Sequence, residues 1–210
     1  MTMYNKVNLS DVDGTVVKGS LVLDFFGYVC PTNEVYQAWK MDKKDESLIV
    51  DCANSFRDWL KGKTVTYVEN MANEFMDTFD SFYVDVLQHI SNSELDTYFI
   101  SGSPYFLVKA LCEKLNKERK GATWFRGMGT LYTTEKGKYT GAVELPMYAK
   151  ENKKQYIENN FHSTDFVNGY GDTSSDYSIL SVCENKYLTE PTEETKAFYK
   201  EKGMDNIVIF

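Results

Sequence analysis

The spacing of hydrophobic residues changes several times along the chain, and each change predicts a different kind of element. Residues Tyr4–Ser10 alternate between apolar and polar positions and end at an acidic turn, which predicts a strand. Between Leu21 and Ile90 the apolar residues recur at helical spacing, and no convincing strand run is present. Strand signals return at Thr97–Ile100. The segment Thr123–Val143 then alternates and contains Gly-Lys-Tyr-Thr-Gly, which predicts a β-hairpin.

The C-terminal part of the chain alternates between helix and strand signals. Asn152–Phe161 and Asp176–Cys183 are predicted helices, whereas Phe166–Tyr170, Lys186–Leu188 and Ile207–Phe210 are predicted strands. Such alternation is typical of a parallel sheet that carries helices on its faces.

A helical block interrupts this α/β pattern directly after the first strand. We therefore predict an α/β protein with a Rossmann-like parallel sheet core, helices on both faces, an inserted helical cap and a β-hairpin. Residues 1–17 and 91–210 would form the core domain, and residues 18–90 the cap. The chain of 210 residues is long enough for a main domain with a smaller inserted unit.

Ser103 and Pro104 mark the expected start of the helix that follows the second strand. A serine hydroxyl commonly caps a helix N-terminus, and proline is favoured at the first helical position. Ser103 is therefore predicted to be an N-cap rather than a ligand-binding residue. Leu107, Leu111 and Leu115 give this helix an apolar face.

Two acidic pairs follow predicted strands. Asp11 and Asp13 follow the first strand, and Asp172 and Asp176 follow a later one. Ligands of open α/β sheets bind beyond the carboxyl ends of the strands, where both pairs would lie. Clustered carboxylates repel one another, and a hard divalent cation relieves that repulsion. Because Mg²⁺ takes oxygen ligands and commonly uses one or two carboxylates plus a substrate phosphate, the pattern predicts a magnesium site.

A phosphoryl ligand would also need hydrogen-bond donors and a positive charge. Ser101 offers a hydroxyl at the end of its strand, and the Gly102 amide would stand near the start of the next helix, where the helix dipole favours an anion. A lysine near the start of the helix predicted after the hairpin would supply the charge. Lys150, Lys153 and Lys154 are the candidates.

Four sequence features occur in a recognisable order. They are Asp-Val-Asp-Gly-Thr at 11–15, a hydrophobic strand ending in Ser101, Lys153 near a helix start, and Gly-Asp-Thr-Ser-Ser-Asp at 171–176. Together they resemble the four motifs of the haloacid dehalogenase superfamily, over essentially the whole chain. The helical insertion, the run Tyr-Phe-Ile-Ser-Gly-Ser-Pro and the hairpin resemble its phosphoserine-phosphatase-like branch.

The resemblance implies a magnesium-dependent phosphatase that hydrolyses a small-molecule phosphomonoester through an aspartyl phosphate. Asp11 would be the nucleophile, and Asp13 would protonate the leaving alkoxide and then activate water. Mg²⁺ would be held by the Asp11 carboxylate, the Asp13 backbone carbonyl and Asp172. Asp176 would orient a metal-bound water or the lysine.

The resemblance also assigns the phosphate-binding residues. Ser101, Gly102 and Lys153 would hold the phosphoryl group, and Lys153 is preferred because its distance to Ile157 matches the spacing in the family. True phosphoserine phosphatases have a glutamate after the first motif where this chain has Ser20, which argues against phosphoserine as the substrate.

Composition narrows the partners. The formal net charge is −8 and no basic stripe is present, which disfavours nucleic acid and anionic membranes as partners. No stretch has the length of a membrane span, and the N-terminus lacks the apolar region of a signal peptide. The four cysteines form no CxxC pair and are expected to be free thiols in a reducing compartment. We expect a cytoplasmic monomer or homodimer that binds a small phosphorylated metabolite.

Two alternatives remain open. A phosphotransferase or mutase could use the same core, although a helical cap favours hydrolysis. A catalytically inactive ligand-binding module is the other alternative, and the intact set of acidic residues argues against it. Dehalogenation is disfavoured because that chemistry needs neither Asp13 nor a metal.

Overall fold

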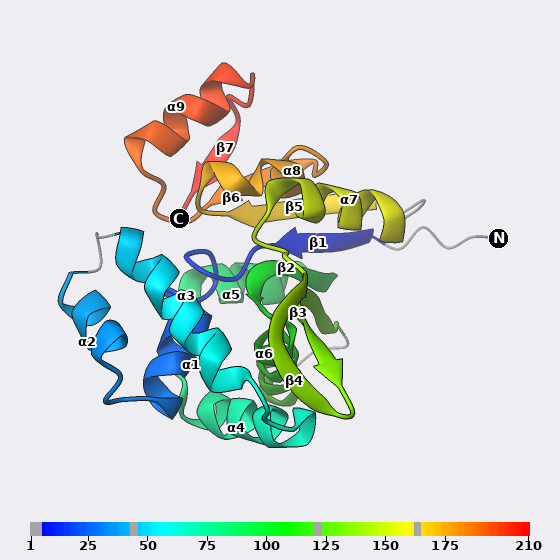
Figure 1. Ribbon diagram of the computed structural model, residues 1–210. Coiled ribbons are helices and arrows are strands. Elements are labelled where there is room, and N and C mark those ends of the chain that lie inside the picture. Colours follow the sequence, from blue (N-terminus) through cyan, green and yellow to red (C-terminus); the bar gives the residue numbers. More distant parts are fainter. Residues whose placement is uncertain (1–5, 43–45, 120–122, 162–164) are drawn as a thin grey trace.

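The computed structural model describes residues 6–42, 46–119, 123–161 and 165–210, in which helices surround one mixed sheet (Figure 1). The helices are α1 (Leu21–Val29), α2 (Glu34–Met41), α3 (Glu46–Leu60), α4 (Val65–Thr78), α5 (Val84–Asn92), α6 (Tyr105–Glu118), α7 (Lys150–Asn160), α8 (Tyr177–Leu180) and α9 (Glu193–Glu201), with a 3₁₀ turn at Ser174–Asp176. The strands are β1 (Lys6–Ser10), β2 (Asp96–Pro104), β3 (Phe125–Glu135), β4 (Lys138–Leu145), β5 (Asp165–Gly171), β6 (Asn185–Leu188) and β7 (Ile207–Ile209).

The strands of the described residues form a sheet in the order β4-β3-β2-β1-β5-β6-β7. Neighbouring strands are parallel except β3 and β4, which form the predicted antiparallel hairpin. β1 lies in the middle, with β2 on one side and β5 on the other. The carboxyl ends of these three strands therefore meet at the same edge of the sheet, where the sequence places its acidic motifs.

Helices cover both faces of the sheet, as predicted (Figure 1). Successive residues of a strand point to opposite faces. Phe99 of β2 accordingly packs in the hydrophobic cluster that contains side chains of α5 and α6. Its neighbour Ile100 packs with Ile157 of α7 and Ile179 of α8 on the other face. The predicted α/β class with a Rossmann-like core is confirmed.

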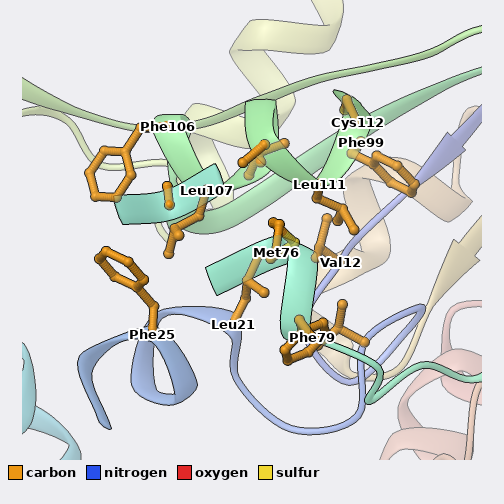
Figure 2. Close-up of a cluster of buried hydrophobic side chains, with 14 of the residues drawn as sticks. Val12, Leu21, Phe25, Met76, Phe79, Phe99, Phe106, Leu107, Leu111 and Cys112 are labelled. Atoms are coloured by element: carbon orange, nitrogen blue, oxygen red, sulfur yellow. The ribbon is translucent and has the colours of Figure 1, made fainter. Parts of the chain in front are cut away.

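In the described residues between 18 and 90, the helices are α1 to α5, and side chains of this region share a hydrophobic cluster with the sheet. Figure 2 shows Phe25 of α1 and Met76 of α4 beside Phe106 and Leu107 of α6. The rings of Phe25 and Phe106 lie edge to face, with their centroids 5.9 Å apart. This continuous apolar contact fixes α1 and α4 against the elements that carry the acidic motifs. The division of the chain into cap and core domains stays a prediction.

The helix after β2 begins later than predicted. Ser103 belongs to β2, Pro104 occupies the N-cap position with φ −55° and ψ 138°, and the first helical residue is Tyr105. The prediction that Ser103 caps this helix is therefore wrong. The extended ψ of Pro104 continues the strand, which pairs there with Thr130 of β3. Gly102 also lies inside the strand, so the expectation that its amide stands at a helix start is wrong as well.

Helix α9 is not among the predicted elements. Thr192 caps it by accepting a hydrogen bond from the Thr195 amide, after Pro191. Its sequence is rich in charged residues, so the apolar periodicity that marks a helix is weak. Its buried Tyr199 nevertheless packs with Leu188 of β6.

Two expectations from composition can be compared with the structure. The four cysteines are free, and Cys52, Cys112 and Cys183 are buried, in agreement with the prediction of unpaired thiols. In the described part of the chain, no helix combines the length and apolar character that crossing a membrane requires.

Candidate active site

Six of the seven predicted site residues contribute side chains to one region at the carboxyl ends of β1, β2 and β5. Asp11 follows β1 directly, and its amide still donates to the Tyr170 carbonyl of β5 at 3.0 Å. Asp172 follows β5, and Ser101 lies near the end of β2. Parallel pairing therefore brings together residues that are distant in the sequence.

Asp11 forms a buried ion pair with Lys153. The Lys153 ammonium lies 2.7 Å from Asp11 Oδ1 and 3.0 Å from Asp176 Oδ1. Lys153 is 3% exposed, Asp11 is 5% exposed and Asp176 is fully buried. Burying such a pair costs desolvation free energy. Removing one partner strongly destabilises the protein, because the other charge is then left buried and unpaired. This lysine therefore fixes the position of the Asp11 carboxylate.

The other two candidate lysines lie elsewhere on α7. Lys150 is the exposed first residue of the helix. Lys154 points to solvent, where it lies 3.7 Å from Glu158 one turn later. Of the three candidates, Lys153 alone makes an ion pair with Asp11, and the geometry supports the preference for it.

Asp13 is held by three hydrogen-bond donors. Its Oδ1 accepts the Leu21 amide at 2.5 Å, and its Oδ2 accepts the hydroxyls of Ser101 at 3.1 Å and Ser103 at 2.8 Å. Burial raises the pKa of Asp13, and these hydrogen bonds oppose that shift. The Asp13 carboxylate thus faces β2 and the start of α1. The contact with Ser103 was not predicted from the sequence.

Asp172 and Asp176 belong to one tightly bonded turn. Asp176 Oδ2 accepts the backbone amides of Asp172 and Thr173 at 3.1 and 3.2 Å. Thr15 donates its hydroxyl to Asp172 Oδ1 at 3.3 Å. Gly14 has φ 75°, and a Cβ there would collide with the Asp172 carboxylate. Glycine is therefore required at position 14, both because φ is positive and because the Asp172 carboxylate lies so close.

The carboxylates can hold a metal ion. Within the residues that the structure describes, oxygen atoms of Asp11, Asp172 and Asp176 lie within 4.8 Å of one another. An all-oxygen donor set of this kind fits a hard cation such as Mg²⁺. The Asp13 side chain is not in this group because it is turned toward the two serines. A role for Asp13 in metal binding would have to use its backbone carbonyl.

The electrostatics favour an added positive charge. Burial raises the pKa of Asp11 to about 7 against the opposing charge of Lys153. Burial and the nearby charge of Asp176 raise the pKa of Asp172 to about 8. Burial alone would lower the pKa of Lys153, but Asp11 and Asp176 outweigh it and raise that pKa. Lys153 thus stays charged, yet its charge does not fully offset the cost of burying the Asp11 carboxylate.

Metal-free protein should lose stability as the pH rises from about 4 to about 8. The folded-state pKa values of Asp11 and Asp172 lie above their ordinary value of 3.8. The native state therefore binds more protons than the unfolded state in this window, and the free energy of unfolding falls with pH. Urea denaturation in EDTA at several pH values would measure how the free energy of unfolding changes with pH. Mg²⁺ should stabilise the protein more at pH 8 than at pH 5.

Two variants make this measurement specific. Asp172→Asn should flatten the slope in EDTA, because one of the groups with a raised pKa no longer titrates. Asp165→Asn, at the exposed start of β5, should leave the slope unchanged. A wild-type stability that rises with pH across this window would contradict the buried-carboxylate account.

Ser101 and Gly102 lie on opposite faces of β2. Ser101 is buried and turned toward Asp13. A Cβ on Gly102 would lie 3.1 Å from Tyr148 Cβ, tighter than most real contacts, and the Gly102 carbonyl accepts the Thr130 hydroxyl at 2.7 Å. Gly102 therefore permits the close approach of the segment before α7, which carries Lys153.

Sequence comparisons find no matching family model and no matching curated protein. Solved structures do match. A protein of unknown function from Bordetella pertussis Tohama I has a TM-score of 0.65 at 13% identity, covering 98% of this chain and 99% of that one. A HAD family hydrolase from Salmonella enterica serovar Typhi has a TM-score of 0.58 at 17% identity, covering 92% and 65%. A substrate-bound phosphoserine phosphatase has a TM-score of 0.55 at 17% identity, covering 97% and 92%.

The chain has the haloacid dehalogenase fold. The likeness extends over nearly the whole chain and includes phosphoserine phosphatases, in agreement with the resemblance seen in the sequence motifs. At these identities it establishes the haloacid dehalogenase fold alone. The activity has to be inferred from the site residues.

Proposed function

We propose that the protein is a magnesium-dependent phosphatase that hydrolyses a small-molecule phosphomonoester through an aspartyl phosphate on Asp11. The observation that carries the proposal is the buried Asp11–Lys153 ion pair beside Asp172 and Asp176, at the carboxyl ends of β1 and β5. Among the proteins with this fold are a substrate-bound phosphoserine phosphatase and one described as a phospho-aspartyl intermediate analogue.

The first step would be attack of Asp11 on phosphorus. Lys153 holds Asp11 Oδ1, so the carboxylate has a fixed orientation before substrate binds. Mg²⁺, held by Asp11 and Asp172 next to Asp176, would offset the repulsion between the anionic nucleophile and the phosphoryl group. One Asp11 oxygen forms a bond to phosphorus while the bond from phosphorus to the leaving alkoxide breaks.

Asp13 would transfer the protons. In the first step it donates a proton to the leaving alkoxide, and in the second it takes a proton from the water that attacks the aspartyl phosphate. The hydroxyl of Ser101 and the ammonium of Lys153 would donate to phosphoryl oxygens, which carry charge throughout the reaction. The second step releases inorganic phosphate and regenerates the Asp11 carboxylate.

The substrate is proposed to be a phosphorylated metabolite other than phosphoserine, because Ser20 replaces the glutamate expected after the first motif. Leu21, the next residue, already donates its amide to Asp13. The segment that begins α1 therefore lies against the proton-transferring residue, where a leaving group would be placed.

Phosphate release from a panel of phosphorylated metabolites tests the proposal. Release should require Mg²⁺, disappear in EDTA and return when Mg²⁺ is added, because the carboxylates need a cation to accept an anionic substrate. Undiminished turnover in EDTA would refute the metal requirement. Transfer of phosphate to an added alcohol without release would instead indicate a phosphotransferase.

A further inference from the structure

We propose that Ser103 is a positioning residue that holds Asp13 during turnover. This role rests on the proposed phosphatase function, in which Asp13 transfers the protons. Ser103 is 1% exposed, and its hydroxyl makes the shorter of the two serine hydrogen bonds to Asp13 Oδ2, 2.8 Å against 3.1 Å for Ser101.

The two serines reach the same oxygen from the end of β2, where the pairing with β3 shifts register between Ile100 and Pro104. The hydroxyls of Ser101 and Ser103 both donate to Asp13 Oδ2, whereas Gly102 between them lies against Tyr148. Proline at 104 also disfavours a helical conformation at Ser103. The irregular end of the strand therefore presents both hydroxyls to Asp13.

The backbone at Ser103 is further fixed by β3. Gly129 lets that strand come so close that a Cβ at position 129 would collide with the Ser103 carbonyl and lie 2.9 Å from the Tyr105 amide nitrogen. The Ser103 amide donates to Ser101 Oγ at 3.0 Å. With its backbone held from both sides, Ser103 presents its side chain from a fixed point, and its hydroxyl donates to Asp13 Oδ2 at 2.8 Å.

Ser101 has a competing role that Ser103 lacks. A hydroxyl has a single proton to donate. When Ser101 gives that proton to a phosphoryl oxygen, its hydrogen bond to Asp13 is lost. Ser103 then supplies the remaining hydroxyl at Oδ2, and the Leu21 amide continues to hold Oδ1.

Serine is suited to both forms of Asp13. Its hydroxyl donates to the carboxylate and can rotate to accept from the carboxylic acid. Asp13 has to be a carboxylic acid when it protonates the leaving alkoxide and a carboxylate when it takes a proton from water. Ser103 can therefore keep the side chain in place through both steps, which a backbone amide cannot do because it only donates.

Ser103→Ala should lower kcat for alkyl phosphates by about 10- to 100-fold, the loss typical of a slightly misplaced catalytic group, with little change in KM. In single-turnover measurements, the loss in the rate of aspartyl phosphate formation should be smaller for p-nitrophenyl phosphate, whose leaving group needs little protonation. Ser103→Ala combined with Asp13→Asn should be no slower than Asp13→Asn alone, because Ser103 acts through Asp13. Ser103→Thr, which keeps the hydroxyl, should retain most of the activity.

A matched control and a second variant separate this role from general damage to the fold. Ser178→Ala removes a serine hydroxyl on α8 that has no hydrogen-bond partner in the described structure, and it should leave turnover unchanged. Should Ser103→Ala fold poorly, Ser103→Cys is nearly isosteric and a weak donor, and it should show the same selective loss. Equal losses on both substrates in the rate of aspartyl phosphate formation would overturn the proposal.

Crystal structures of wild type and of the Ser103 variant provide a readout that does not depend on activity. Asp13 should adopt one rotamer in the wild type and a different or divided one in the variant, with and without beryllium trifluoride. An unmoved Asp13, or unchanged turnover in an active enzyme, would overturn the proposal. A wild type that releases no phosphate would refute the proposed function, and the Asp13 rotamer would then decide alone whether Ser103 anchors it.

Discussion

Asp11→Asn is expected to abolish phosphate release, with a loss of about 10⁴-fold or more, as is usual when a nucleophile is removed. An amide is a poor nucleophile and cannot form the aspartyl phosphate. The asparagine oxygen can still accept the hydrogen bond that Lys153 gives to Asp11 Oδ1 at 2.7 Å. Because Lys153 also keeps its bond to Asp176, the fold should survive. The measurement is phosphate release by wild type and variant against the same metabolite panel.

Beryllium trifluoride makes the test independent of finding the substrate. This mimic of a phosphoryl group should raise the melting temperature of the wild type in the presence of Mg²⁺ by binding the native state, and it should not stabilise Asp11→Asn. Asp165→Asn, which changes an exposed carboxylate at the start of β5, should behave as wild type. Full turnover in Asp11→Asn would remove Asp11 as the nucleophile. Absence of both release and stabilisation in the wild type would favour a ligand-binding module.

The acidic residues of the site could be predicted from the local sequence pattern. Asp11 and Asp172 each follow a short run of strand-forming residues, and parallel strands put their carboxyl ends at one edge. Burial raises the pKa of both carboxyl groups and makes a bound cation favourable, which supports the metal site that the pattern predicted. The lysine that pairs with Asp11 could not be identified from local pattern alone. Lys153 could be separated from Lys150 and Lys154 by family spacing, whereas the physical reason is the direction in which each side chain leaves α7.

Ser103 could not be placed from sequence for a specific reason. A helix N-cap and a strand residue both have extended backbone angles, so the pair Ser103–Pro104 fits either interpretation. The choice depends on ψ of Pro104, which is 138° because the strand continues and pairs with β3. That pairing is a tertiary contact with Thr130, and no local pattern reports it. Helix α9 escaped prediction for a related reason, since its stability comes from packing of Tyr199 rather than from apolar periodicity.

The packing partners of the helices between β1 and β2 also depend on tertiary contacts. Helical periodicity identified residues 18–90 as helical, but it carries no information about which partner each helix packs against. In the structure, Phe25 and Phe75 of the insertion lie edge to face at 5.5 Å, and Phe25 also contacts Phe106 of α6. The apolar cluster is therefore continuous from the insertion to the sheet. This continuity places Leu21 firmly enough for its amide to hold Asp13.

Asp13→Asn is expected to slow hydrolysis of alkyl phosphates by about 10²–10⁴-fold, the usual contribution of general acid–base catalysis. The variant should keep its geometry. Asparagine can accept the Leu21 amide with its oxygen and donate its amide protons to the hydroxyls of Ser101 and Ser103. Melting temperatures of variant and wild type should therefore be similar, and the lost rate can be attributed to proton transfer.

The two chemical steps can be separated with p-nitrophenyl phosphate. Its leaving group departs without a proton, so Asp13→Asn should still form the aspartyl phosphate on Asp11 from this substrate. The second step needs a base to take a proton from water, and asparagine cannot serve as one. We therefore expect a burst of p-nitrophenol equal to the enzyme concentration, followed by slow turnover, whereas alkyl phosphates should show no burst. Asp13→Asn with equal losses on both substrates and no burst would show that Asp13 does not protonate the leaving group.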